Sequence, residues 1–194
     1  MKDVRTGWPY RLRSFLQRAR SLPVVAAMKA AGMHVHWGTL VQTTELPWMV
    51  GQWLTLGRRA QLCRGAALAI GPNGSLDIGA DTAIGRFNSI CALGMLHIGA
   101  GCLFSEWVHV SDAEHIIQPG ISPVYSGLKF KAPVHISRYC MIGRLVTILP
   151  GTILGRGCVV GANSVVNGYW PAGSVIAGTP AKLIRTINAC DTSS

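Results

Sequence analysis

Charge and long apolar runs are both scarce in this sequence of 194 residues. Only 13% of the residues are charged and only 8 are acidic, which would be unusual in a compact α/β protein. No apolar run approaches the roughly 20 residues that a membrane-spanning helix needs. The nearest candidate, residues 22–33, is interrupted by Lys29 and follows an Arg-rich stretch, so we interpret it as part of the fold rather than as a signal peptide.

The six cysteines lack the CxxC spacing that metal sites and redox motifs use. We therefore expect small buried thiols in a reducing, cytoplasmic compartment, with no metal bound. The net charge of +10 is unevenly distributed, because residues 1–38 hold seven Lys or Arg against Asp3 alone. Few aromatic residues are interleaved with these basic residues, and no nucleic-acid-binding module is recognisable. We therefore predict no nucleic-acid partner.

Glycine is abundant, with 23 residues, and the chain from Ile136 to Pro171 repeats with a period of six. An aliphatic residue occupies every sixth position, glycine follows it at Gly143, Gly155 and Gly161, and the fifth position of each repeat is nearly always small. This period predicts a parallel β-helix, an all-β solenoid in which three short strands make one coil of eighteen residues. Leu154 should then stack on Ile136, and the ladders of inward aliphatic side chains should form the core.

We predict the solenoid at residues 38–180, with an arm before it, an insertion within it and a short segment after it. Residues 1–37 predict a basic arm with one helix over residues 8–20 and a second, opened by Pro23, running to about Ala31. Residues 111–133 fit no sixfold frame, and an irregular insertion of this length in a solenoid is usually functional. Residues 181–194 predict a short helix from Ala181 to Asn188 and a polar tail.

Two interpretations of the arm remain open, and they are compatible. It can cap the open end of the solenoid, whose strand edge would otherwise be exposed. It can also form a peripheral contact with the anionic headgroups at the inner face of a membrane.

The repeat, the segment from Val110 to His115 and the segment from Ala177 to Arg185 resemble the hexapeptide-repeat O-acyltransferases. Among these, the chain looks most like sugar and polysaccharide O-acetyltransferases related to maltose, galactoside and Nod-factor acetyltransferases. The resemblance covers about residues 78–185 and implies a left-handed β-helix, a homotrimer with active sites between subunits, and acetyl-CoA as the acetyl donor. It further implies an enzyme that acetylates a sugar hydroxyl of a surface polysaccharide or its lipid-linked precursor.

The family's catalytic histidine opens the interrupting loop, and this position corresponds to His115. An imidazole can remove the proton of a sugar hydroxyl during direct attack on the thioester and then protonate the leaving thiolate. Asp112 is the preferred partner to orient this ring, with Glu114 as the alternative. His109 and His135 are weaker rivals for the base.

The family binds coenzyme A along the C-terminal coils. Carried over by position, the candidates here are Arg144, Ala162, Asn163, Asn167, Gly168, Lys182 and Arg185. Asn167 and Gly168 depart from the Thr-Lys pair of many relatives, which leaves the contacts at that point open. For the acceptor, the resemblance points to Asn88, Tyr125 and Lys129, and Asn88 also has a structural interpretation as a small corner residue.

Three other functions stay open at this point. The acceptor could be a small molecule such as an amino acid, an antibiotic or a free sugar. A solenoid of this type could instead act without catalysis, in binding or assembly. A γ-carbonic-anhydrase-like zinc enzyme is disfavoured, because His109 and His115 do not have that family's close spacing and no third ligand is evident.

Overall fold

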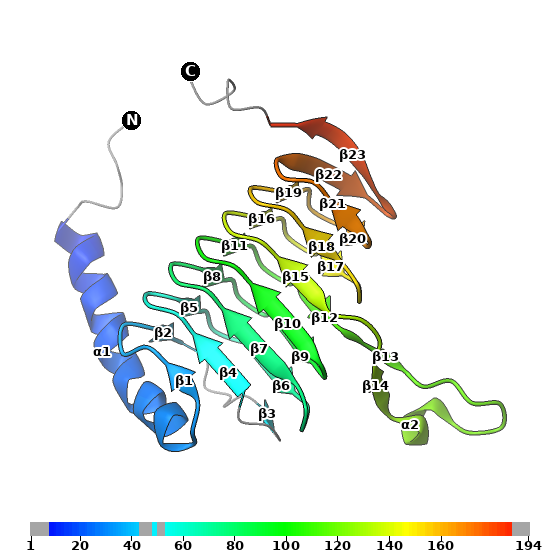
Figure 1. Cartoon of the computed structure of the whole chain (residues 1–194). Coiled ribbons are helices and arrows are strands. Elements are labelled where there is room, and N and C mark those ends of the chain that lie inside the picture. The colour runs from blue at the N-terminus through cyan, green and yellow to red at the C-terminus, as the bar shows by residue number, and fades with distance from the viewer. Residues whose placement is uncertain (1–7, 43–47, 50–52, 188–194) are drawn as a thin grey trace.

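The computed structural model describes the backbone of residues 8–42, 48–49 and 53–187, and side chains from residue 19 onward outside the gaps. The chain forms a left-handed parallel β-helix whose three sheets are the faces of a prism (Figure 1). Sheet A contains β1 (His34–Val35), β4 (Trp53–Leu56), β7 (Ser75–Ile78), β10 (Met95–Ile98), β15 (Val134–Ile136), β18 (Ile153–Leu154) and β21 (Tyr169–Trp170).

The other two faces repeat this stacking. Sheet B contains β2 (Leu40–Val41), β5 (Gln61–Leu62), β8 (Ala83–Ile84), β11 (Leu103–Phe104), β16 (Met141–Ile142), β19 (Val159–Val160), β22 (Ser174–Gly178) and β23 (Ala181–Thr186). Sheet C contains β3 (Trp48–Met49), β6 (Ala67–Ile70), β9 (Ser89–Ala92), β12 (His109–Ser111), β17 (Thr147–Ile148) and β20 (Val165–Val166). We call the corners between successive sheets AB, BC and CA.

The predicted inward ladder is confirmed. Leu154 pairs directly with Ile136, and Ile136 pairs with Ile98 across the inserted residues. All three side chains are fully buried. Because each coil places one aliphatic residue per face under the same residue of the next coil, the core is continuous along the prism.

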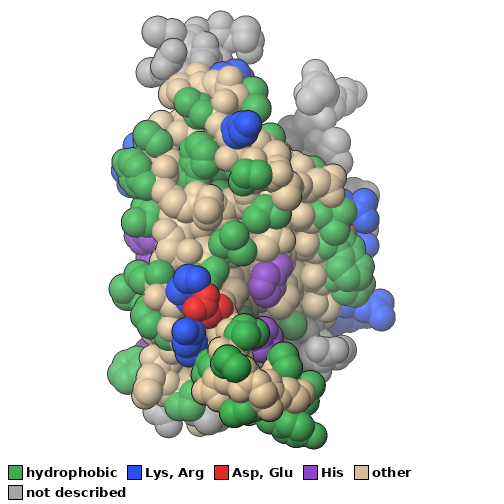
Figure 2. All heavy atoms as spheres, turned by 90° about the vertical axis from the view of Figure 1, so that its right-hand side faces the viewer, with side chains coloured by type: hydrophobic (Ala, Val, Ile, Leu, Met, Phe, Trp, Pro, Cys, Tyr) green, Lys and Arg blue, Asp and Glu red, His purple; other side chains and the backbone are tan. Residues whose placement is uncertain are grey.

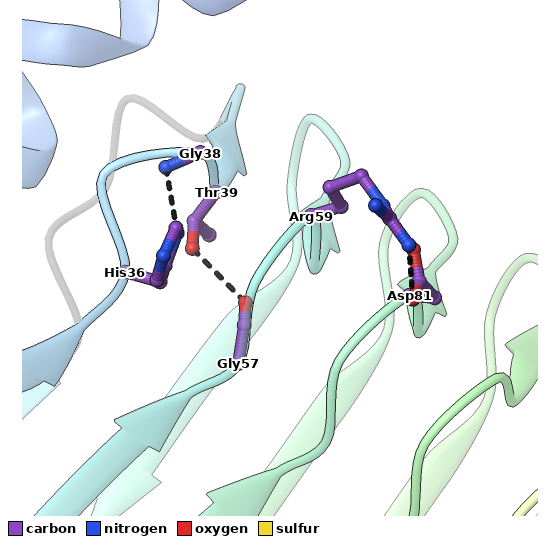
Figure 3. Close-up of polar contacts among 6 residues, drawn as sticks. All are labelled: His36, Gly38, Thr39, Gly57, Arg59 and Asp81. Carbon is purple, nitrogen blue, oxygen red and sulfur yellow. Dashed lines mark hydrogen bonds and ion pairs between the residues drawn. The ribbon is translucent and has the colours of Figure 1, made fainter.

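Polar contacts at the corners tie successive coils together. At the AB corner, Thr39 Oγ1 donates to the Gly57 carbonyl at 3.3 Å, and the Arg59 guanidinium pairs with the Asp81 carboxylate of the next coil (Figure 3). Further along this corner the backbones are so close that a Cβ on Gly99 would lie 2.5 Å from the Arg138 nitrogen. Only a residue without a side chain fits there.

The arm is one helix, α1 (Trp8–Ala30), so the prediction of two helices was wrong. Pro23 lies inside α1, where it removes one backbone hydrogen bond. Val25 and Met28 are buried against the first coils, and Ser21 Oγ donates to the Thr39 carbonyl, so packing on the solenoid offsets that loss. No helix in the described part of the chain is long and apolar enough to cross a bilayer.

The C-terminal segment is a strand and not the predicted helix. β23 runs antiparallel to β22, with Lys182 opposite Ala177 and Arg185 opposite Val175. The free edge of β22 offers unpaired backbone groups, and satisfying them outweighs the helical preference of the Ala-Lys-Leu sequence. Asn188, the predicted last helical residue, lies outside the described residues.

The insertion at the CA corner is a hairpin that projects from the prism (Figure 1). After β12, the strand β13 (Ala113–His115) pairs antiparallel with β14 (Leu128–Phe130), and a helical turn, α2 (Pro123–Ser126), lies between them. The repeat resumes at β15. The sequence located this excursion but did not reveal its hairpin.

Candidate functional site

The base of the hairpin is fixed by Asp112, whose side chain is fully buried. Its carboxylate accepts hydrogen bonds from the backbone N–H groups of Leu93 and Gly94, both at 2.8 Å. Its own carbonyl accepts from the N–H of Lys131 at 2.9 Å, on the returning side of the hairpin. Asp112 therefore joins the preceding coil to both sides of the hairpin base.

This placement differs from the role that we predicted for Asp112. Within the described residues, neither Asp112 nor Glu114 hydrogen-bonds to His115. The Glu114 carboxylate instead pairs with Lys131 and with Lys129, whose Nζ lies 3.3 Å away, and the hydrogen bond from Lys131 is the main reason that the pKa of Glu114 is lowered. Figure 2 looks onto this side of the molecule, where one acidic side chain lies between two basic ones.

His115 ends β13, opposite Leu128, and its side chain is exposed. The strand pairing fixes its backbone, whereas its ring has solvent access. A neutral imidazole in this position can accept a proton from a hydroxyl brought against the hairpin. Of its rivals, His109 lies on the outer face of sheet C, and burial lowers its pKa.

Aromatic side chains extend along the hairpin. Phe130 lies directly on Gly94, where a Cβ would come within 2.3 Å of the ring. Tyr125, a predicted acceptor contact in α2, has 84% of its surface exposed. The hairpin thus presents His115, Tyr125 and Lys129 on one projecting element.

Asn88 does not join this group. It is buried at the BC corner, at the opposite end of β9 from the hairpin, and its Oδ1 accepts from the Val108 N–H at 2.7 Å. Its prediction as an acceptor contact therefore gives way to the structural interpretation, because the side chain bridges two coils inside the corner. Among the described residues, Asn88 Nδ2 has no hydrogen-bond partner.

The candidate coenzyme A residues fall into two places. Arg144, Ala162 and Asn163 lie at the BC corner, where the Asn163 N–H donates to the Arg144 carbonyl at 2.9 Å. Lys182, the second residue of β23, lies near the same corner. Asn167 and Gly168 lie at the CA corner, further along the prism from the hairpin, and Arg185 is near the AB end of β23. One chain alone does not bring all of these residues together.

His97 was not among the predicted site residues, although its sequence position carries a signal. His97 and His135 each precede an inward isoleucine, so they share an outward position on sheet A. Their rings stack with centroids 4.7 Å apart, and His97 Nδ1 lies 2.9 Å from Asp77 Oδ2. Burial, and secondarily the charge of His97, lowers the pKa of His135. Within the described residues, no three His, Cys, Asp or Glu side chains are arranged to hold a metal.

The fold and the repeat together define a β-helix protein of the hexapeptide-repeat class. Residues 133–168 match the family described as bacterial transferase hexapeptide (six repeats). The proteins that the chain resembles in sequence are named as acetyltransferases.

Two of these relatives are informative. The chain is 31% identical over 155 residues to the "Probable acetyltransferase Rv3034c" of Mycobacterium tuberculosis, covering 79% of this chain and 48% of that protein. It is 40% identical over 107 residues to WbbJ of Escherichia coli K12, which is named for O-acetyl transfer in lipopolysaccharide biosynthesis, covering 51% of this chain and 54% of WbbJ. The chain thus spans about half the length of these relatives.

Solved structures share the fold at lower identity. AntD, an N-acyltransferase from Bacillus cereus solved with dTDP and 3-hydroxybutyryl-CoA, matches with a TM-score of 0.69 and 18% identity, over 86% of this chain and 89% of that one. The hexapeptide-repeat acetyltransferase VCA0836 from Vibrio cholerae matches with a TM-score of 0.56 and 18% identity, over 92% and 90%. At this identity, the likeness supports the fold alone.

Proposed function

We propose that this chain is an acetyl-CoA-dependent O-acetyltransferase. Its acceptor is a sugar hydroxyl of a surface polysaccharide or of the lipid-linked precursor. The observation that carries the proposal is the hairpin, which interrupts the ladder between β12 and β15 and presents an exposed imidazole, His115, beside a coil surface. The relatives named as acetyltransferases, WbbJ among them, support the same reaction class.

In this proposal the acceptor hydroxyl attacks the thioester carbonyl directly. His115 removes the hydroxyl proton as the C–O bond forms, and the same proton then goes to the departing thiolate of coenzyme A. The N–H groups of a neighbouring coil stabilise the oxyanion of the tetrahedral intermediate. No covalent acyl-enzyme is required.

The proposed site is completed by a second copy of the chain, in a homotrimer. The scattered positions of the coenzyme candidates support such an assembly, since the BC corner of one subunit can face the hairpin of the next. Arg144 and Lys182 would then bind phosphates of coenzyme A as charge-assisted donors. Tyr125 and Lys129 would border the acceptor, and the membrane contact of residues 1–37 remains part of this proposal.

The test measures acetyl-CoA consumption by the purified protein, whether it is a trimer or a monomer. It also measures the mass of the acceptor glycan. We expect His115→Ala to lose at least about a hundredfold in turnover, the usual contribution of a general base, while acetyl-CoA binding persists. His109→Ala is the matched control and should retain turnover. Full activity of His115→Ala would refute the assignment, and acetylation of amines but not hydroxyls would refute the acceptor class.

A further inference from the structure

A groove at the AB corner lies apart from the hairpin. Its cavity volume is about 540 Å³, and its floor consists of small residues. The lining residues are Gly79, His97, Gly99, Ala100, His135, Ser137, Arg138 and Arg156. It is therefore a broad, shallow site with two cations and two imidazoles around a floor of glycine and alanine.

The two guanidiniums of this groove are held together by an aromatic ring. Arg138 and Arg156 occupy equivalent positions in adjacent coils. Their Cζ atoms lie 5.9 Å and 5.2 Å, respectively, from the centroid of the Tyr139 ring. Tyr139 has φ of +64° and covers Gly101, so the turn itself directs the ring outward. Stacking on an aromatic face orients guanidinium groups while leaving their N–H donors available.

Neither cation has an anionic partner among the residues that the structure describes. The contrast is with Arg59 on the same corner, which pairs with Asp81 of the next coil (Figure 3). On the histidine side of the groove, the Asp77 carboxylate is hydrogen-bonded to His97. Two adjacent unpaired guanidiniums favour a ligand with two negative charges.

The stacked histidines also line the groove, on the sheet A side. Asp77 holds the His97 ring through Nδ1, and the His135 ring lies nearly parallel to it, with an interplanar angle of 12°. These flat rings border the small-residue floor of the groove. The groove thus combines an anion-binding end with a side wall for the rest of a ligand.

We propose that this groove binds the phosphate or diphosphate group of a ligand, with Arg138 and Arg156 as its cationic donors. Guanidinium groups match the geometry of phosphate oxygens, with two N–H donors directed at two oxygens. Two sources share this chemistry: a nucleoside diphosphate such as an activated sugar carries, and coenzyme A, whose phosphates would then lie here instead of on Arg144 and Lys182. Binding is measured without turnover, so this test does not depend on His115 as the base.

The experiment is isothermal titration calorimetry of the full chain with inorganic pyrophosphate, uridine 5′-diphosphate and coenzyme A as separate probes. The test variant is Arg138→Gln with Arg156→Gln. The matched control is Arg86→Gln, an exposed corner arginine outside the groove. Since a hydrogen bond to a charged group contributes roughly tenfold or more in affinity, we expect the double variant to weaken binding about a hundredfold and Arg86→Gln to change it little.

The probes distinguish the sources. Loss of uridine diphosphate binding with unchanged coenzyme A affinity assigns the groove to a nucleotide-linked ligand, and the reverse assigns it to coenzyme A. If the double variant loses binding of pyrophosphate alone, the groove recognises only the diphosphate group. The proposal is overturned if no probe binds the wild type at millimolar concentration, if the double variant binds normally, or if Arg86→Gln loses as much. Such a failure leaves the result with His115→Ala untouched.

Discussion

The Asp112 carboxylate accepts a hydrogen bond from the Gly94 N–H at 2.8 Å, and this bond connects the projecting hairpin to the preceding coil. With its equal bond to Leu93, it satisfies two backbone donors at a point where the regular ladder is interrupted. A buried carboxylate with two N–H donors is a rigid anchor, so the position of His115 depends on a residue that, in the described part of the chain, does not hydrogen-bond to it.

Removing this anchor should cost stability and activity together. Asp112→Ala leaves two N–H groups without their acceptor, and we expect the free energy of unfolding to fall by about 2–4 kcal/mol. Asp112→Asn keeps one acceptor oxygen and should lie between Ala and wild type. Urea denaturation and acetyl transfer measure the two effects. If Asp112→Asn lost activity at unchanged stability, orientation of His115 would be its main role instead.

The contact between Phe130 and Gly94 should be sensitive to a single methyl group. A Cβ on Gly94 would lie 2.3 Å from the ring, so Gly94→Ala must displace Phe130, which is partly exposed and able to move. We expect faster proteolysis of residues 113–130 with little loss of overall stability. Gly157→Ala is the control, because a Cβ added at Gly157 meets open space. The only expected cost of this substitution is backbone strain at φ +69°. Equal protection of the hairpin in both variants would contradict this prediction.

Deleting β23 should expose an edge that associates. A chain ending at Thr179 leaves β22 with unpaired backbone groups along sheet B, and we expect a lower Tm and concentration-dependent aggregation. A chain ending at Ile187 retains the strand and serves as the control. Light scattering during thermal unfolding measures both effects. A truncated chain as soluble and stable as the control would mean that this edge needs no cover.

Acidification should destabilise the fold in part through His135. Its folded-state pKa is lowered, so below the unfolded value of about 6.5 the unfolded chain takes up a proton more readily than the folded chain. The contribution to stability is therefore present above that pH and is lost as the pH falls through the folded pKa. We expect Tm to fall less between about pH 7.5 and about pH 5.5 for His135→Gln than for the wild type. An identical drop would show that His135 does not contribute.

The sequence by itself determined the solenoid, because an aliphatic residue at every sixth position has only one way to be buried repeatedly. Ile136 and Leu154 were placed correctly on that basis, and the break in period located the hairpin. Backbone pairing at an edge decided what the sequence could not: β23 is a strand because β22 offered it partners. Long-range stacking likewise decided that Asn88 and Asp112 lie inside corners and that His97 meets His135, since a side chain's neighbours are in other coils.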